Sequence, residues 1–193
     1  MKRICVYCGS SPGNSPIYYE AAKALAHELV ERGFGLVYGG ASIGVMGKIA
    51  NAVLENGGEV IGVIPQALVD KEVSHHGLTE LKIVSSMHER KAAMADYADG
   101  FIALPGGLGT FEELFEVLTW AQLGFHQKPI GVLNVQGYYD KLSQFVDHAV
   151  EQGFMKQAHR DMMLMADDAS CLLDLMRDYV PLNVEKLIHR DET

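Results

Sequence analysis

The sequence has few cysteines, few positive charges and no long apolar run, and each shortage excludes a class of protein. Cysteine occurs three times in 193 residues, at Cys5, Cys8 and Cys171, which is too sparse for a disulfide framework and fits a reducing compartment. Acidic side chains outnumber basic ones, and the formal net charge is −9. That balance argues against nucleic-acid binding, which needs basic patches, although a few local groups can still hold one small anion.

The apolar stretches are all shorter than the roughly 20 residues that cross a membrane. The chain enters a predicted strand by Ile4 without the apolar core of a signal peptide, so we expect a cytoplasmic protein. Cys5 and Cys8 form a C-x-x-C pattern, but residues three apart in a strand point to opposite faces. Because no second cysteine pair and no H-x-x-x-H spacing accompany them, we predict buried structural thiols and no metal site.

Short apolar runs alternate with longer amphipathic segments along the chain. Strands are predicted at 3–8, 35–38, 60–64, 81–84, 100–104, 130–133 and 162–165, and helices at 16–32, 48–56, 86–97, 110–123, 138–151 and 168–179. This alternation predicts an α/β fold, a Rossmann-like doubly wound parallel sheet with helices on both faces. We expect one nucleotide-binding domain over residues 1–180, a polar tail at 181–193 and an irregular segment at 65–77.

Two glycine-rich loops follow predicted strands, and each opens a helix. The first contains Gly39, Gly40, Gly44 and Gly47, and the second is residues 105–110. Ligands of open parallel sheets bind beyond the carboxyl ends of the strands. Glycine lets backbone N–H groups approach an anion, and a helix N-terminus adds free donors. Each loop is therefore either a phosphate or ribose site or simply a tight turn.

A basic pair is predicted at the same edge of the sheet. Ser86 and Glu89 fit the capping box of a helix that starts there. Either Arg90 or Lys91 continues the inward stripe marked by Met87 and other apolar residues of that helix. This position indicates an anionic partner, and the alternative is a solvated pair whose aliphatic stems lie on the surface.

Three carboxylates crowd the start of the next helix, at Glu112, Glu113 and Glu116. Crowding raises the pKa of at least one carboxyl, which suits acid–base catalysis. Thr110 and Glu113 also fit a capping box, so Glu113 is either a catalyst or a helix cap. Thr119 shares the helix face of Glu112 and Glu116 and offers a hydroxyl.

At this point a family resemblance is clear. Residues 105–113, PGGLGTFEE, match the PGGxGTxxE signature of the "lonely guy" family, and residues 87–91, MHERK, resemble its second motif. Segments 119–124 and 131–134 are also similar, so the resemblance runs from the first strand to about Tyr179. The chain departs from it at Leu108, where plant members usually have tyrosine, and at Ala41, where a third glycine is common.

The resemblance implies a homodimeric cytokinin riboside 5′-monophosphate phosphoribohydrolase. Such an enzyme cleaves the N-glycosidic bond of a nucleoside 5′-monophosphate, a cytokinin nucleotide or AMP, to free base and ribose 5-phosphate. By motif position, Arg90 and Glu113 would be the catalytic pair. The substrate would be lined by Glu72, Arg90, Lys91, Gly107, Leu108, Gly109, Thr110, Phe111, Glu112, Glu113 and Thr119.

Two other functions are weighed against this one. Members of the family are often labelled lysine decarboxylase-like, but we find no lysine site for pyridoxal phosphate and predict no cofactor. The alternative that we retain is a non-catalytic nucleotide or cofactor carrier on the same fold, which would bind a phosphate ligand without releasing a base.

Overall fold

The computed structural model describes residues 1–71 and 74–182, and these residues confirm the predicted α/β architecture. The strands are β1 (Arg3–Tyr7), β2 (Gly35–Tyr38), β3 (Val60–Pro65), β4 (Glu80–Val84), β5 (Gly100–Ala103), β6 (Ile130–Leu133) and β7 (Met163–Ala166). The helices are α1 (Ile17–Glu31), α2 (Gly44–Glu55), α3 (Gln66–Val69), α4 (Met87–Tyr97), α5 (Leu108–Gln122), the 3-10 turn η1 (Val135–Gly137), α6 (Asp140–Glu151), α7 (Gln157–Arg160) and α8 (Ala169–Arg177).

The strands form one parallel sheet in the order β4-β3-β2-β1-β5-β6-β7. From β1 the chain proceeds outward through β2 and β3 to β4, then returns to β5 on the other side of β1 and continues outward to β7. The order therefore reverses between β1 and β5. In doubly wound sheets the ligand crevice opens at such a reversal.

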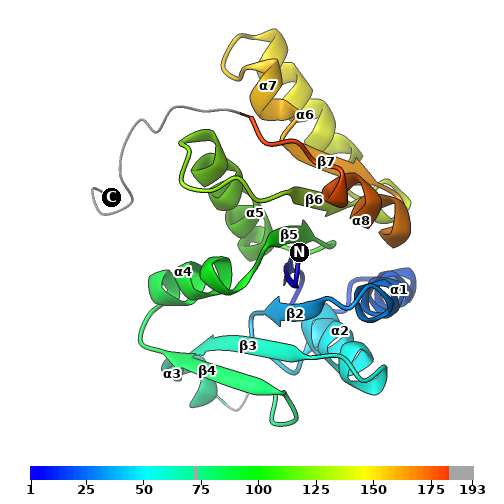
Figure 1. Ribbon diagram of the computed structural model, residues 1–193, viewed down its shortest axis with the longest axis vertical. Helices are drawn as coiled ribbons and strands as arrows, with labels where there is room; N and C mark the ends of the chain where they lie inside the picture. Colours follow the sequence, from blue (N-terminus) through cyan, green and yellow to red (C-terminus); the bar gives the residue numbers. More distant parts are fainter. Residues whose placement is uncertain (72–73, 183–193) are drawn as a thin grey trace.

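Each face of the sheet is covered by its own helices (Figure 1). Helices α1, α2 and α8 pack on one face, whereas α4 and α5 pack on the other. Side chains alternate between the two faces along β1, so Cys8 belongs to the first cluster and Cys5 to the second. Both thiols are free and buried, as the sequence predicted.

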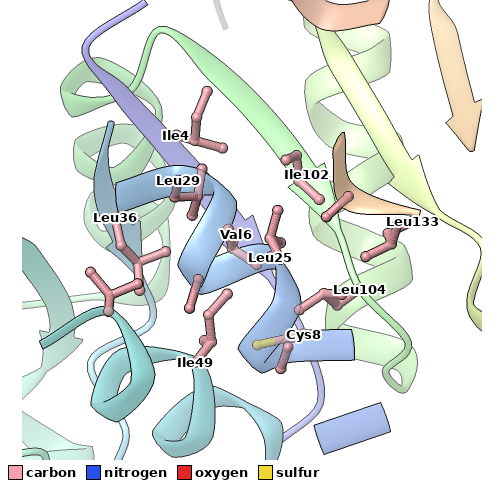
Figure 2. Close-up of a cluster of buried hydrophobic side chains, with 14 of the residues drawn as sticks. Ile4, Val6, Cys8, Leu25, Leu29, Leu36, Ile49, Ile102, Leu104 and Leu133 are labelled. Carbon is pink, nitrogen blue, oxygen red and sulfur yellow. The ribbon is translucent and has the colours of Figure 1, made fainter. Parts of the chain in front are cut away.

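The first cluster fills the space between β1 and the helices α1 and α2 (Figure 2). Ile4 and Val6 of β1 meet Leu25 and Leu29 of α1, all with at most 1% exposure. Leu29 follows Leu25 by four residues, which places both on one helix face. This packing fixes the β1–α1 unit, whose intervening loop borders the crevice.

The segment predicted to be irregular contains a short helix, α3, and a second short helix, α7, was also not predicted. Each has only four residues, too few to show a helical repeat of apolar side chains. The predicted tail lies outside the described residues from position 183 onward. In the described part of the chain, no helix combines the length and apolarity required to span a membrane.

We predict that Gly44→Ala destabilises the fold more than Gly57→Ala. Both glycines have positive φ, +61° and +78°, so each substitution costs about 1–2 kcal/mol in backbone strain. A Cβ at Gly44 would also lie 2.2 Å from the Ser10 carbonyl carbon, whereas one at Gly57 meets no atom within 4 Å. The additional overlap should cost a further ~1–3 kcal/mol in urea unfolding, and equal losses would contradict this account.

Candidate active site

A cavity of about 210 Å³ opens beyond the carboxyl ends of β1 and β5, where the strand order reverses. Its lining comes from β1 and the loop after it, from the two glycine loops, and from α4 and α5. The lining residues are Val6, Tyr7, Cys8, Gly9, Ser10, Gly39, Met46, Arg90, Met94, Gly107, Leu108, Gly109, Thr110 and Glu113. The cavity thus unites the second glycine loop with both predicted catalytic side chains.

Arg90 is the basic residue of α4 that points inward, and it is only 8% exposed. Its Nε donates to the carbonyl oxygen of Val63 on β3 (3.1 Å), and its Nη1 lies 3.3 Å from Glu113 Oε1. Met87, predicted on the same inward face, is 47% exposed instead, because it is the first residue of α4. Ser86 Oγ caps α4 by accepting from the Glu89 N–H.

Glu113 is buried beside Arg90 and is also 8% exposed. Burial raises its pKa from 4.5 to about 7, Arg90 and Lys91 oppose that rise, and Glu112 and Glu116 add to it. The sequence predicted a raised pKa from crowding, but loss of solvation is the larger cause. The capping-box alternative is wrong, because α5 begins at Leu108 with Gly107 as its N-cap. Glu113 therefore lies in the second turn and faces the guanidinium.

Lys91 lies next to this pair but does not line the cavity. Its Nζ is 2.5 Å from Glu112 Oε1 and 2.9 Å from Glu116 Oε1, and its side chain is 11% exposed. The three carboxylates that crowd α5 are therefore divided between two cations of α4. Arg90 takes the buried carboxylate, and Lys91 takes the two that flank it.

Among the described residues, the second glycine loop leaves backbone donors free at the start of α5. The N–H of Phe111 donates to Gly107 O (3.1 Å), so the N–H groups of Leu108, Gly109 and Thr110 precede the first helical hydrogen bond. A Cβ at Gly107 or Gly109 would meet no atom within 4 Å. Neither has positive φ, so within the described protein neither packing nor backbone conformation requires glycine there. A ligand that approaches the amides closely would require it.

The first glycine loop packs tightly against the rest of the site. A Cβ at Gly39 would lie 2.0 Å from Arg90 Nη2, and one at Gly47 would lie 2.0 Å from Ser42 O. The N–H groups of Val45 and Met46 both donate to Gly9 O, at 3.0 and 3.3 Å. These contacts explain the glycines by close packing, and a second phosphate or ribose site at this loop stays a prediction.

Four described residues of the predicted lining do not border the cavity: Lys91, Phe111, Glu112 and Thr119. Thr119 donates its hydroxyl to Phe115 O and borders a separate cavity of about 50 Å³, about 16 Å along α5 from Leu108. The ring of Phe111 packs on Tyr139, with the centroids 6.3 Å apart. Glu72 lies outside the described residues.

Sequence reasoning missed the contribution of β1 and its following loop. Tyr7 and Ser10 line the cavity, and Ser10 also borders an adjoining cavity of about 290 Å³ that includes Tyr18 and Tyr138. The position of Ser10 just after the first strand was the available signal, because ligands bind beyond the carboxyl ends of such strands.

Comparison with known proteins shows strong sequence similarity. Residues 46–176 match the family described as "Possible lysine decarboxylase". The chain is 53% identical to cytokinin riboside 5′-monophosphate phosphoribohydrolase LOG2 of Arabidopsis thaliana, over 93% of this chain and 84% of that protein. It is 54% identical to the phosphoribohydrolase LOG of Oryza sativa subsp. japonica, over 93% of this chain and 74% of that protein.

Solved structures share the fold at lower sequence identity. The molybdenum cofactor binding protein of Rippkaea orientalis is 18% identical, with a TM-score of 0.68 over 92% of this chain and 96% of that one. The Moco carrier protein of Chlamydomonas reinhardtii is 20% identical, with a TM-score of 0.68 over 91% and 95%. These likenesses support the fold alone.

We predict that Glu113→Gln gains stability relative to the wild type as the pH rises. The folded pKa of Glu113, about 7, lies above the unfolded value of 4.5, so folding favours its proton. In the wild type, the contribution of Glu113 to the free energy of unfolding is fully present below pH 4.5. It is lost as the pH rises through 7, and the total loss is about 3 kcal/mol. Glutamine cannot ionise and avoids this loss.

Urea unfolding at pH 5 and pH 8 measures the effect, with Glu55→Gln on the exposed face of α2 as the control. From pH 5 to pH 8, the free energy of unfolding of Glu113→Gln should increase by roughly 2–3 kcal/mol relative to that of the wild type. The difference for Glu55→Gln should stay constant. A Glu113→Gln difference that also stays constant would contradict the raised pKa.

Proposed function

The chain belongs to the family described as possible lysine decarboxylases and, within it, to the cytokinin riboside 5′-monophosphate phosphoribohydrolases, and from this premise we propose its reaction. It hydrolyses the N-glycosidic bond of a nucleoside 5′-monophosphate to a free base and ribose 5-phosphate. The observation that carries the proposal is the cavity in which a buried carboxylate, a guanidinium and a helix N-terminus converge. These are the groups that an anionic sugar with a departing base requires.

The phosphate binds the free N–H groups of Leu108, Gly109 and Thr110 in our proposal. A helix N-terminus carries a partial positive charge, and within the described part of the chain these three donors of α5 have no partner and border the cavity. The open space over Gly107 and Gly109 lets an anion reach them. Local donors of this kind can hold one phosphate in spite of the net negative charge of the chain.

Glu113 and Arg90 act on the glycosidic bond. As the bond to the base breaks, the sugar acquires oxocarbenium character. The Glu113 carboxylate stabilises that charge or removes a proton from the attacking water, and Arg90 holds the substrate and assists departure of the base. Water supplies a hydroxyl to the anomeric carbon and a proton to the base. With a pKa of about 7, Glu113 is about half ionised at neutral pH, so both roles are available to it.

The base is adenine or N6-prenylated adenine in this proposal. Incubation with AMP and with isopentenyl-AMP, followed by chromatography for free adenine and free isopentenyladenine, measures the preference directly. Release of base from either nucleotide supports the hydrolase. Binding of both nucleotides without release of base would favour the carrier instead.

The family description as a lysine decarboxylase fits this cavity poorly. Pyridoxal phosphate enzymes hold their cofactor on a lysine amine. In the described part of the chain no lysine lines the cavity. Lys91 follows Arg90 directly in the sequence, but its Nζ is bound to two carboxylates. Lysine incubated with the protein should therefore give no cadaverine, with or without added pyridoxal phosphate.

We further propose that the enzyme is a cytoplasmic homodimer. The separation of Thr119 from the cavity supports a dimer, since a substrate contact by that hydroxyl would need a second chain. Large apolar side chains also stand exposed, Leu108 at 86% and Phe145 at 67%. Light scattering after size-exclusion chromatography should give twice the 21.2 kDa chain mass, and a monomer with full activity would refute the dimer.

We predict that Glu113→Gln reduces turnover by roughly 100-fold or more while the fold is retained. The substitution preserves size and removes the charge that the sugar cation or the water requires. Base release under single-turnover conditions is the measurement, with circular dichroism to verify folding. Wild-type hydrolysis by the variant would refute the role of Glu113.

We predict that Gly109→Ala separates binding from stability. Gly109 is the second residue of α5, where alanine is a better helix former by about 0.5–1 kcal/mol. Its methyl group would project into the open space beside the amides and weaken nucleotide binding by tenfold or more. Calorimetric titration with AMP and urea unfolding test the two effects. An unchanged affinity would show that the phosphate binds elsewhere.

A further inference from the structure

The carboxylates around Glu113 create an electrostatic problem that the catalytic pair does not solve. Arg90 can balance one negative charge, and it is held against Glu113 and the Val63 carbonyl oxygen. Glu112 and Glu116 flank Glu113 on the same helix, and both raise its pKa. Two uncompensated neighbours would favour the protonated form of Glu113.

Lys91 contacts both of these neighbours at once. Its Nζ donates to Glu112 Oε1 at 2.5 Å and to Glu116 Oε1 at 2.9 Å, which joins α4 to α5 one residue away from the Arg90–Glu113 contact. The Lys91 side chain is 11% exposed, while Glu116 is 23% and Glu112 54% exposed, so the contact with Glu116 is the better shielded of the two. Its ammonium group does not reach the cavity lining.

We propose that Lys91 is a positioning residue that clamps α5 onto α4 and neutralises Glu112 and Glu116, so that Glu113 faces Arg90 as a carboxylate. Lys91 then acts through Glu113 rather than on the substrate. This assignment replaces the substrate contact expected from its place in the motif. It rests on the proposed function, because it concerns the ionised form of the residue that acts on the glycosidic bond.

Among the described residues, other charged and titratable groups also surround Glu113. Arg90 faces it from α4, and Glu112 and Glu116 belong to its own helix. Cys5 and Tyr7 of β1, and Cys8 directly after it, also lie near Glu113. Burial is the main cause that raises the pKa values of all three. These three stay neutral near pH 7, so Lys91 is the cation that balances the flanking carboxylates.

Three variants of the full chain isolate the clamp, and each is verified by circular dichroism. Lys91→Met removes the charge and keeps the length, and Lys91→Arg keeps the charge. A third variant combines Lys91→Met with Glu112→Gln and Glu116→Gln and so removes the clamp together with the charges it balances. Lys23→Met on α1 is the matched control, because it breaks the Lys23–Glu20 pair far from the cavity.

The first measurement is the ¹³C NMR titration of the Glu113 carboxyl without substrate, assigned by its absence in Glu113→Gln. In Lys91→Met the midpoint should rise by about one pH unit from its wild-type value near 7. Lys91→Arg and the triple variant should titrate close to the wild type, as should Lys23→Met. A midpoint that does not move in Lys91→Met would overturn the inference.

The second measurement is the pH profile of base release. At pH 7 a one-unit rise lowers the ionised fraction of Glu113 in the free enzyme from about one half to about one eleventh, so kcat/KM of Lys91→Met should fall about fivefold. KM should change less than twofold, and the triple variant should recover most of kcat. If KM of Lys91→Met rose tenfold while the acidic side of its pH profile stayed unchanged, Lys91 would instead bind the substrate. If the wild type releases no base, the proposed function fails, whereas the NMR titration still tests the clamp.

Discussion

The contact between Arg90 and Glu113 is the constraint on which the rest of the site depends. Removing two charges from water costs several kcal/mol each, and a buried pair regains that only with good geometry and further hydrogen bonds. Arg90 obtains one such bond from Val63 O of β3, and Gly39 leaves the space that its guanidinium occupies. The pair therefore ties together β3, α4, α5 and the loop after β2. A core built for stability alone would not need these charges, which agrees with the catalytic role proposed for the pair.

The sheet topology brings these elements to one place. Because the strand order reverses between β1 and β5, the chain leaves these two central strands on opposite faces, with α1 following β1 and α5 following β5. The loops separate at the crevice, and the N-terminus of α5 points into it. Helix α4 packs on the same face as α5, which allows consecutive residues of α4 to meet consecutive turns of α5.

Local patterns predicted the sheet, its longer helices and an inward direction for either Arg90 or Lys91, since these depend on short-range apolar repeats. They failed where a contact between residues distant in the sequence determined the local structure. Thr110 and Glu113 satisfy a capping box by spacing, but Gly107 starts α5 three residues earlier, so the glutamate is free to face Arg90. Gly39 looked like part of a phosphate loop, but its neighbour is Arg90, 51 positions away in sequence. The bond between Lys91 and Glu112 joins two helices and has no local signature.

In the proposed reaction, the helix that offers donors to the phosphate also carries the carboxylate that acts on the sugar, so binding and catalysis are electrically coupled. Two cations, Arg90 and Lys91, already face three carboxylates of α5. A bound phosphate adds negative charge and favours a proton on Glu113, which is half protonated near pH 7 before any substrate arrives. The N–H groups at the start of α5 would offset part of the phosphate charge, and a direct contact between the phosphate and Arg90 would offset more. A cavity with the carboxylate but without this guanidinium would bind its substrate and thereby protonate the group required to stabilise the sugar cation.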